Sequence, residues 1–355
     1  GHRYPPILDK VEDFRRASFV DSSSSNVNIP NRWALEILSR FATPLRWTYI
    51  AQEIDSRQRV AVLCYVPVSI FLDLDLALRR LFWLLVPGNM RIRTYRSLAS
   101  LGARMYGFTD SPNVQQLPFG LYLKMVILTR RESLVNENAT LELVRRHTNV
   151  PVPRALDLIS DSSDIYLLTT RISGYKLGWC IDTMSDEDTA TLVHDLRRHI
   201  IALRAIPRPP GWKHAISNAV DGPCFDYRIN AALDYDEDRG EVAGPFLSED
   251  DFNDTLRCGA LPEVVHRGGR KMVFTHGDLN LKNVLIDGHG RLAGIVDWEN
   301  AGWFPEYWDY TKAYFVTKLH QRWLRMVDDM FDQFGDFEHE LKIERELWNY
   351  CFWNT

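Results

Sequence analysis

Short apolar runs separated by polar turns predict a group of strands in the first half of the chain. Leu121 to Ile127 is almost wholly apolar, and the runs 154–159 and 165–171 follow with a Ser-Asp-Ser-Ser turn between them. Runs of this length, bounded by turn residues, are typical of strands. The intervening segment 137–147 has a helical pattern and ends at a Pro-rich stretch. Residues 98–173 therefore predict a small unit of strands with one helix, which we call the N-lobe.

The second half of the chain has mainly the periodicity of helices. Ser185 is expected to cap a long helix, and helices rich in aromatic residues are expected over 307–334 and 337–353. The exception is 284–297, where two apolar runs joined by Gly-His-Gly predict a β-hairpin. Together the patterns predict an α+β fold of two lobes, in which 174–355 form the larger, mainly helical C-lobe.

Residues 1–97 belong to neither predicted lobe, and we expect an N-terminal extension that contains helices. Its apolar segment 60–86 is interrupted by a proline and by charges, which are costly at the centre of a bilayer, so no membrane-spanning segment is expected. From Leu72 to Val86 the pattern suits an amphipathic helix. That helix either packs against the body of the protein or brings 60–97 into contact with a membrane surface.

Composition limits the classes of function. A chain of 355 residues favours more than one lobe, and a net charge of −5 gives no sign of a nucleic-acid-binding surface. The five cysteines are odd in number, scattered and without a C-x-x-C pair. This pattern argues against a disulfide framework or a zinc site and predicts a reducing compartment, the cytoplasm.

The strongest chemical signal is a polar loop that follows the apolar strand 272–274. It reads His-Gly-Asp-Leu-Asn-Leu-Lys-Asn, with His276, Asp278 and Asn283 at its key positions. Phosphoryl transfer needs a carboxylate to orient the hydroxyl group of the acceptor and an amide oxygen to hold a metal ion. On this interpretation Asp278 is the base and Asn283 a metal ligand. A strand–turn–strand with polar turn residues is the alternative.

Asp297 stands at the end of the second strand of the predicted hairpin. The hairpin returns this carboxylate to the neighbourhood of Asn283, and carboxylate and amide oxygens together suit Mg²⁺. Taken alone, Asp297 is better explained as a helix N-cap or a turn residue. Its short connection to Asp278 and Asn283 favours the metal site.

Lys124 lies within an apolar strand, where an ammonium group without a partner is costly. Glu137 is expected to open the following helix, and a strand lysine paired with a helix glutamate is the arrangement that grips nucleotide phosphates in kinases. Two other interpretations remain. Lys124 could extend to solvent from a strand edge, and Glu137 could be an acid of the first helical turn, stabilised by the helix dipole.

These residues resemble the aminoglycoside phosphotransferase and choline kinase-like family, whose fold is that of eukaryotic protein kinases. The resemblance implies an antiparallel sheet with one helix in the N-lobe. The strings 117–124 and 294–308 are most similar to fungal members of uncertain substrate, and the likeness covers residues 98–320. The resemblance implies ATP as donor, with GTP as a second possibility, and Mg²⁺ as cofactor.

The resemblance also implies a role for each site residue. Asp278 is implied as the catalytic base, with Asn283 and Asp297 as Mg²⁺ ligands. Lys124 is implied to contact the α- and β-phosphates and to be held by Glu137. Two further residues are implied to support the loop: they are His276 and Asp309, a buried acid at the start of a helix.

Some features fit this family less well or receive no role. The glycines before Lys124 are too dispersed for a tight phosphate-binding loop. Glu299 is either an accessory residue near the metal or a solvated turn acid, and the acidic run 234–238 either attracts a cationic acceptor or forms a solvated loop. We expect the neighbouring aromatic residues to be core: Trp298, Trp303, Tyr307 and Trp308.

The predicted function is that of a small-molecule kinase, which transfers the γ-phosphate of ATP to a hydroxyl group of a metabolite or antibiotic-like acceptor. Its partners are then a nucleotide and a small molecule. One alternative is a nucleotide-binding pseudokinase that acts as a binding module. Another is a biosynthetic enzyme that uses the same fold for a different reaction. Protein-kinase activity is disfavoured, because residues 297–305 leave no room for a long activation loop.

Overall fold

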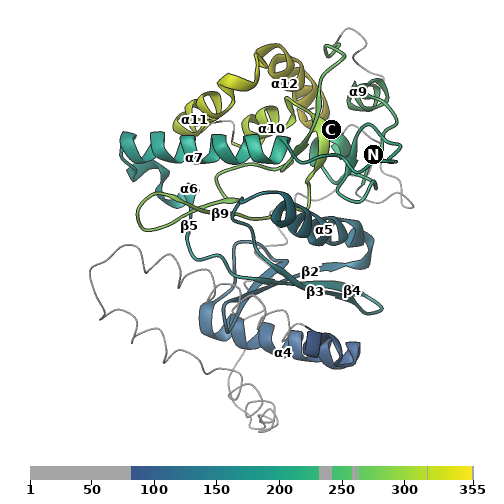
Figure 1. Cartoon of the computed structure of the whole chain (residues 1–355), viewed down its shortest axis with the longest axis vertical. Coiled ribbons are helices and arrows are strands. Elements are labelled where there is room, and N and C mark those ends of the chain that lie inside the picture. Colours follow the sequence, from purple (N-terminus) through teal and green to yellow (C-terminus); the bar gives the residue numbers. More distant parts are fainter. Residues whose placement is uncertain (1–80, 232–241, 258–260, 262–263, 318, 354–355) are drawn as a thin grey trace, which may run out of the picture. The chain divides into compact units, whose positions relative to one another are not determined.

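The structure is a computed structural model that describes residues 81–353 apart from 232–241, 258–260, 262–263 and 318 (Figure 1). The chain divides into two units, 1–72 and 73–355, and the described residues all belong to the second. Most of the predicted amphipathic segment 72–86 and the acidic run 234–238 lie outside the described residues. Within the described part of the chain, no helix has the length and apolar character needed to cross a membrane.

The N-lobe contains a four-stranded antiparallel sheet with the strand order β1-β2-β4-β3 (Figure 1). Its strands are β1 (Val114–Leu117), β2 (Leu121–Ile127), β3 (Ala155–Ser160) and β4 (Asp164–Thr170). Successive residues of β4 face opposite sides of the sheet, as the geometry of a strand requires. Ile165 and Leu167 join one hydrophobic cluster, whereas Tyr166 and Leu168 join another. The central part of β4 is therefore buried on both faces of the sheet.

One helix packs on each face of this sheet (Figure 1). Helix α5 (Arg131–His147) contributes Leu134, Leu141 and Val144 to the cluster that contains Leu167. Helix α5 begins at Arg131 and not at Glu137, because the short 3₁₀ turn Leu128–Arg130 leads directly into it. Glu137 therefore lies in the helix interior and is not an acid of the first turn.

Helix α4 (Gly88–Tyr106) packs on the opposite face through Ile92 and Tyr95. It runs across the boundary that the sequence predicted between residues 97 and 98. Asp157 of β3 ties this helix to the sheet: it is 4% exposed and accepts hydrogen bonds from Arg91 Nη1 and Tyr95 Oη, both at 2.5 Å. A buried carboxylate is tolerated only when it is paired, so these two contacts stabilise the position of α4.

The C-lobe is mainly helical, as predicted. Its helices are α6 (Leu177–Cys180), α7 (Asp186–Arg204), α8 (Tyr227–Ala231), α9 (Glu249–Arg257), α10 (Trp308–Val316), α11 (Gln321–Phe331) and α12 (Glu338–Trp353). Ser185 caps α7, since its Oγ accepts from Asp188 N at 3.0 Å. The single helix predicted over 307–334 is wrong. His320 caps a new helix by accepting from Trp323 N at 3.3 Å, so α10 and α11 are separate.

Two small sheets carry the polar loop and the hairpin. The predicted hairpin is present, and a short strand from the junction between the lobes extends it. The order of this sheet is β5 (Tyr175–Lys176), β8 (Val284–Ile286) and β9 (Leu292–Ile295). The other sheet has the order β6 (Ser217–Asn218), β10 (Gly302–Pro305) and β7 (Met272–Thr275). The polar loop thus runs from β7 in one sheet to β8 in the other.

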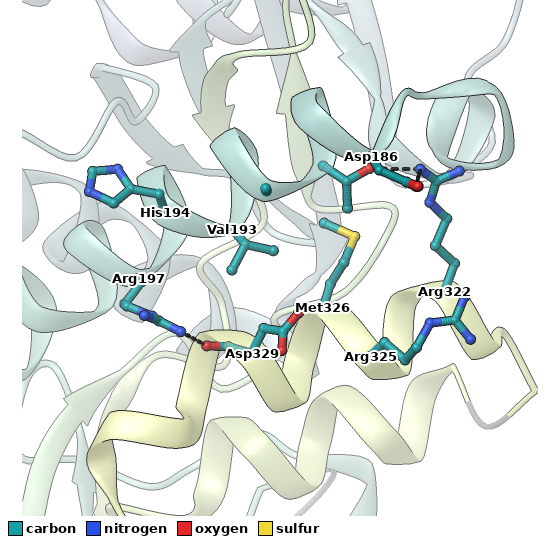
Figure 2. A pocket seen from close by; sticks show the side chains of 10 residues that line it. Asp186, Val193, His194, Arg197, Arg322, Arg325, Met326 and Asp329 are labelled. Atoms are coloured by element: carbon teal, nitrogen blue, oxygen red, sulfur yellow. Dashed lines mark hydrogen bonds and ion pairs between the residues drawn. The ribbon is translucent and has the colours of Figure 1, made fainter.

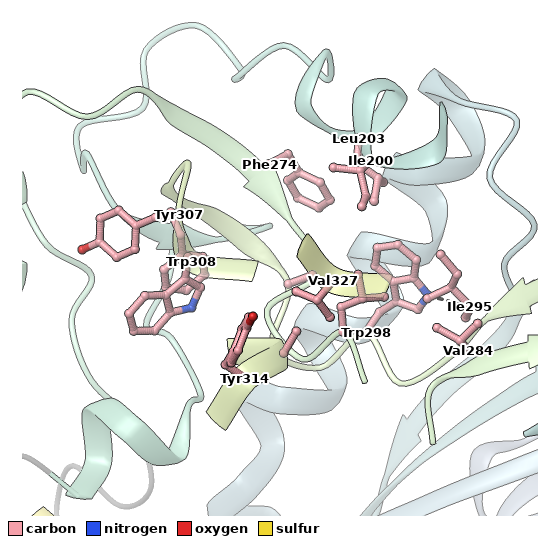
Figure 3. Close-up of a cluster of buried hydrophobic side chains, with 14 of the residues drawn as sticks. Ile200, Leu203, Phe274, Val284, Ile295, Trp298, Tyr307, Trp308, Tyr314 and Val327 are labelled. Atoms are coloured by element: carbon pink, nitrogen blue, oxygen red, sulfur yellow. Dashed lines mark hydrogen bonds between the residues drawn. The ribbon is translucent and has the colours of Figure 1, made fainter. Parts of the chain in front are cut away.

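Large aromatic side chains fill the core of the C-lobe (Figure 3). Trp298 and Trp308 lie in this cluster with Phe274 of β7 and with Ile200 and Leu203 of α7. The four aromatic residues predicted to be core are at most 2% exposed. Aromatic side chains of this size contribute much of the buried apolar area of a core.

The tie between α4 and Asp157 can be tested by Arg91→Met. Because this change leaves the buried carboxylate with Tyr95 as its remaining partner, we expect a loss of about 2–3 kcal/mol in the free energy of unfolding, measured with urea. Arg93→Met is the matched control, since Arg93 is exposed on the same helix, and should change stability by at most about 0.5 kcal/mol. Equal stability of the two variants would contradict the proposed tie.

Candidate active site

The polar loop, residues 276–283, is held in place by Asp309 at the start of α10. Asp309 is buried, and its two carboxylate oxygens accept from the backbone N–H groups of Gly277 at 2.8 Å and His276 at 3.2 Å. Gly277 has a φ of +78°, and a Cβ placed there would lie 2.1 Å from the carbonyl oxygen of Asn300. The loop backbone is therefore fixed by a charged acceptor on one side and by close packing on the other.

His276 supports the same loop through both ring nitrogens. Its Nδ1 accepts from Asp278 N at 3.1 Å, and its Nε2 donates to the carbonyl oxygen of Val296 at 3.1 Å. The ring lies against Trp298, with 4.4 Å between the ring centroids. Burial lowers the pKa of His276, which keeps the ring neutral and suits this pattern of one donor and one acceptor. With both nitrogens occupied, His276 connects the loop to the segment that precedes Asp297.

Asp278 projects from the loop with one oxygen occupied. Its Oδ2 accepts from Asn283 Nδ2 at 2.9 Å and Asn280 Nδ2 at 3.1 Å. The other oxygen, Oδ1, lies 3.9 Å from Lys312 Nζ, and the side chain is 23% exposed. Burial raises the pKa of Asp278 to about 7, although the positive charge of Lys312 acts to lower it. The carboxylate is thus oriented by amides and keeps one oxygen for a ligand.

Asn283 and Asp297 are brought together by the hairpin. Asn283 uses its amide nitrogen on the carbonyl and Oδ2 of Asp278, at 2.8 and 2.9 Å, which leaves its amide oxygen available. Val296 N donates to the carbonyl oxygen of Asn283 at 2.9 Å, so Asp297 follows one residue after this contact. Asp297 has a φ of +66°, a conformation that is strained for a residue with a Cβ and that is found mainly at functional sites.

Lys124 lies among three carboxylates. Its Nζ is 2.6 Å from Asp297 Oδ1, 2.9 Å from Glu137 Oε2 and 3.1 Å from Glu299 Oε2. Burial by itself lowers the pKa of Lys124, but the three carboxylates raise it well above its ordinary value. Lys124 therefore does not extend to solvent, and the structure pairs it with Glu137 and with Asp297 of the other lobe.

Glu299 was not assigned a role from the sequence, and the structure places it in this cluster. Its side chain is 15% exposed, close to Lys124 and 3.6 Å from Arg130 Nη2. The solvated turn acid considered for this position is therefore excluded. One sequence signal could have indicated this position. Glu299 stands two residues after Asp297, so its carboxylate can lie close to that of Asp297.

The acidic cluster has the chemistry of a divalent cation site. Ligand oxygens of Glu137, Asp297 and Glu299 lie within 4.8 Å of one another. Three carboxylates beside an ammonium leave a local excess of negative charge, and the amide oxygen of Asn283, the residue before β8, is available. Mg²⁺ prefers oxygen ligands of this type and is commonly held by one or two of them together with phosphate oxygens. The residues present therefore fit Mg²⁺.

The turn that precedes the strand of Lys124 is short and is not a glycine-rich loop. Leu117 pairs with Leu121, so Pro118, Phe119 and Gly120 form the turn between β1 and β2. Phe119 and Gly120 both have positive φ values, 67° and 70°, and Phe119 is exposed.

A separate hollow of about 430 Å³ lies between α7 and α11 (Figure 2). Arg322 donates a hydrogen bond to the carboxylate of Asp186 across the hollow, and Arg197 donates one to the carbonyl oxygen of Asp329. None of the site residues described above lines this hollow, so we assign it no part in the chemistry.

Two lobes joined at a short strand, a strand lysine paired with a helix glutamate, and a loop and hairpin that supply aspartates and an asparagine define the kinase-like class of phosphotransferases. Residues 123–340 match the sequence profile of the phosphotransferase enzyme family. The chain belongs to this family, and the predicted resemblance and the predicted two-lobed α+β fold are confirmed.

The chain is similar to solved structures of aminoglycoside phosphotransferases. APH(3″)-Id from Streptomyces rimosus, in complex with ADP and streptomycin, has 19% identity and a TM-score of 0.48, covering 72% of this chain and 97% of its own. A mutant aminoglycoside 2′-phosphotransferase-IIIa with GDP has 16% identity and a TM-score of 0.49, covering 73% and 89%. Both TM-scores lie below 0.5, so the family assignment rests on the sequence match. No curated protein matches the chain significantly in sequence.

The close packing of the loop leads to a prediction for Gly277→Ala. The new Cβ would overlap the carbonyl oxygen of Asn300 and force a left-handed conformation on alanine, so we expect a loss of about 2–5 kcal/mol in the free energy of unfolding. Gly288→Ala is the matched control, because nothing lies within 4 Å of a Cβ at that position. Urea unfolding measures both variants, and a Gly277→Ala variant as stable as the control would refute the packing argument.

Proposed function

We propose that this protein is a small-molecule kinase that transfers the γ-phosphate of ATP, or of GTP, to a hydroxyl group of a metabolite or antibiotic-like acceptor. The observation that carries the proposal is the meeting of three charged groups from the two lobes. Lys124 and Glu137 of the N-lobe meet Asp297 of the C-lobe within hydrogen-bond distance, and the hairpin connects Asp297 to Asn283 and Asp278. Membership of the phosphotransferase enzyme family supports it.

On this proposal the donor binds between Lys124 and the hairpin. Lys124 contacts the α- and β-phosphates, and Glu137 holds the ammonium group in place. Asn283 and Asp297 hold Mg²⁺, with Glu299 beside them as an accessory acid. When bound, the metal neutralises charge on the phosphates and orients them. Because the lysine and the metal ligands belong to different lobes, correct placement of the lobes completes the donor site.

Asp278 then acts on the acceptor. Asn280 and Asn283 occupy its Oδ2, so Oδ1 is the oxygen that accepts the proton of the acceptor hydroxyl group. A bond forms between the acceptor oxygen and the γ-phosphorus as the bond to the β–γ bridging oxygen breaks, and ADP leaves. Such reactions depend mainly on positioning and on neutralisation of charge. His276 and Asp309 contribute by holding the loop backbone.

We propose that the acceptor site lies against residues 207–260 and the C-terminal helices. We also propose the cytoplasm as the location of the reaction. The scattered, odd-numbered cysteines suit a reducing compartment, and Cys180 and Cys224 are free thiols.

The first test is a search for the acceptor with γ-labelled ATP and a metabolite extract. The wild-type chain should label one small molecule, and Asp278→Asn or Asp297→Ala should lower this labelling by at least about 10³-fold, because Asp278 takes the proton of the acceptor and Asp297 holds the metal that binds the donor. Asp250→Asn is the control, since Asp250 is exposed on α9. Near-normal labelling by Asp278→Asn would exclude Asp278 as the base. Binding of Mg-ATP without any labelled product would favour a pseudokinase instead.

A second test measures the binding of the donor. At a concentration about 100 times its Kd, Mg-ATP should stabilise the wild-type fold by about 2.7 kcal/mol and raise the melting temperature by several degrees. Asp297→Asn should lose most of this rise, because the metal and Lys124 both depend on that carboxylate. An undiminished rise in Asp297→Asn would place the nucleotide elsewhere. The Asp250→Asn variant should respond as the wild type does.

A further inference from the structure

Four charged side chains are buried together in the C-lobe behind the polar loop. They come from distant parts of the chain: Asp226 immediately before α8, Arg228 on α8, Lys312 on α10, and Glu344 on α12. Each is at most 3% exposed. Charges are seldom buried to this extent, and they are tolerated only in close pairs with further hydrogen bonds.

The four charges form a continuous chain of contacts. Glu344 Oε2 is 3.5 Å from Arg228 Nη1, which also donates to Thr311 Oγ1 at 2.8 Å. Arg228 N donates to Asp226 Oδ1 at 2.8 Å, and Lys312 Nζ donates to Asp226 Oδ2 at 2.9 Å. The guanidinium of Arg228 also lies 3.5 Å from the ring centroid of Trp308. The ammonium of Lys312 is thus held at the end of a rigid series of partners.

The ammonium of Lys312 also lies near Asp278. Lys312 Nζ lies 3.9 Å from Asp278 Oδ1, longer than a hydrogen bond but within the range of an ion pair. An ammonium has three N–H donors, of which Asp226 takes one. Lys312 also stands one helical turn after Asp309, so one face of α10 holds the loop backbone through Asp309 and approaches the loop side chain through Lys312.

Lys312 already has a carboxylate partner without Asp278. Asp226 contacts Lys312 and Arg228, whereas Glu344 contacts Arg228 and the buried His266, whose Nε2 lies 2.9 Å from Glu344 Oε1. The lysine could serve Asp226 without lying next to Asp278, yet it is placed on the one carboxylate oxygen that the amides of Asn280 and Asn283 leave free.

We propose that Lys312 is a positioning residue for Asp278: anchored by Asp226, its ammonium directs Oδ1 of the carboxylate toward the acceptor hydroxyl group. This inference rests on the proposed function, in which Asp278 is the base. The two amides hold Oδ2 and the cation holds the orientation of Oδ1. Because no direct hydrogen bond forms at 3.9 Å, Oδ1 keeps its lone pairs for the proton of the acceptor.

The experiment uses the full chain and γ-labelled Mg-ATP, measuring phosphate released to water and phosphate transferred to components of a metabolite extract. Lys312→Met should lower turnover about 10- to 100-fold, as expected for a misplaced catalytic group. The KM for Mg-ATP should stay within about twofold, because Lys312 does not touch the donor site. Lys312→Arg keeps the charge and should retain more activity than Lys312→Met. Lys342→Met is the matched control, since Lys342 is exposed on α12.

The double variant Asp226→Asn with Lys312→Met separates positioning from a structural role. Lys312→Met alone disturbs the buried charge balance and should lower the melting temperature, whereas removal of both charges should restore much of it. If Lys312 positions Asp278, turnover stays low in the double variant although stability returns. If turnover recovers together with the melting temperature, Lys312 only balances Asp226 and the inference is wrong.

Asp278→Asn is the reference that separates this inference from the proposed function. Equal turnover of the wild type and Asp278→Asn, or no turnover by the wild type with any component of the extract or with water, would overturn the proposed function and the inference with it. An inactive Asp278→Asn beside a fully active Lys312→Met would overturn the inference alone.

Discussion

The site depends on one interaction, the ammonium of Lys124 held among carboxylates from both lobes. An ammonium within an apolar sheet is costly, and each nearby carboxylate is costly without a cation, so the groups stabilise one another only when the lobes meet. The contacts of 2.6 Å to Asp297 and 2.9 Å to Glu137 join the segment after β9 to helix α5. The same local excess of negative charge makes the place suitable for a divalent cation. The charges that join the two lobes are therefore the same charges that form the candidate cation site.

Around this centre the polar loop is held by backbone contacts. Asp309 accepts from two backbone N–H groups, His276 spans to Val296, and Gly277 fits where no side chain could. Preorganised groups of this kind need no rearrangement when the substrate binds, which is the main way in which proteins accelerate phosphoryl transfer. The strained backbone of Asp297 belongs to the same design, because surrounding contacts must hold a positive φ at a residue other than glycine.

Local patterns predicted most of the secondary structure and missed what depends on contacts between distant residues. The strand over Leu121–Ile127 and the hairpin were predicted because short apolar runs and turn glycines are local signals. The start of α5 and the break between α10 and α11 were not, because a 3₁₀ turn and the capping histidine His320 leave weak signals in sequence. Glu299 was left between two interpretations, since its burial beside Lys124 arises only when the lobes pack together.

The sequence by itself determined the family and the set of donor-site candidates, because the spacing of His276, Asp278, Asn283 and Asp297 and the lysine within an apolar strand are visible in one dimension. Only the tertiary structure decided which charges share a site. Asp226, Lys312 and Glu344 stand far from Asp278 along the chain, and no local pattern marks them as a connected group. They act together because folding removes them from water, where a buried charge is stable only beside a partner, and that pairing selects neighbours in space and not in sequence.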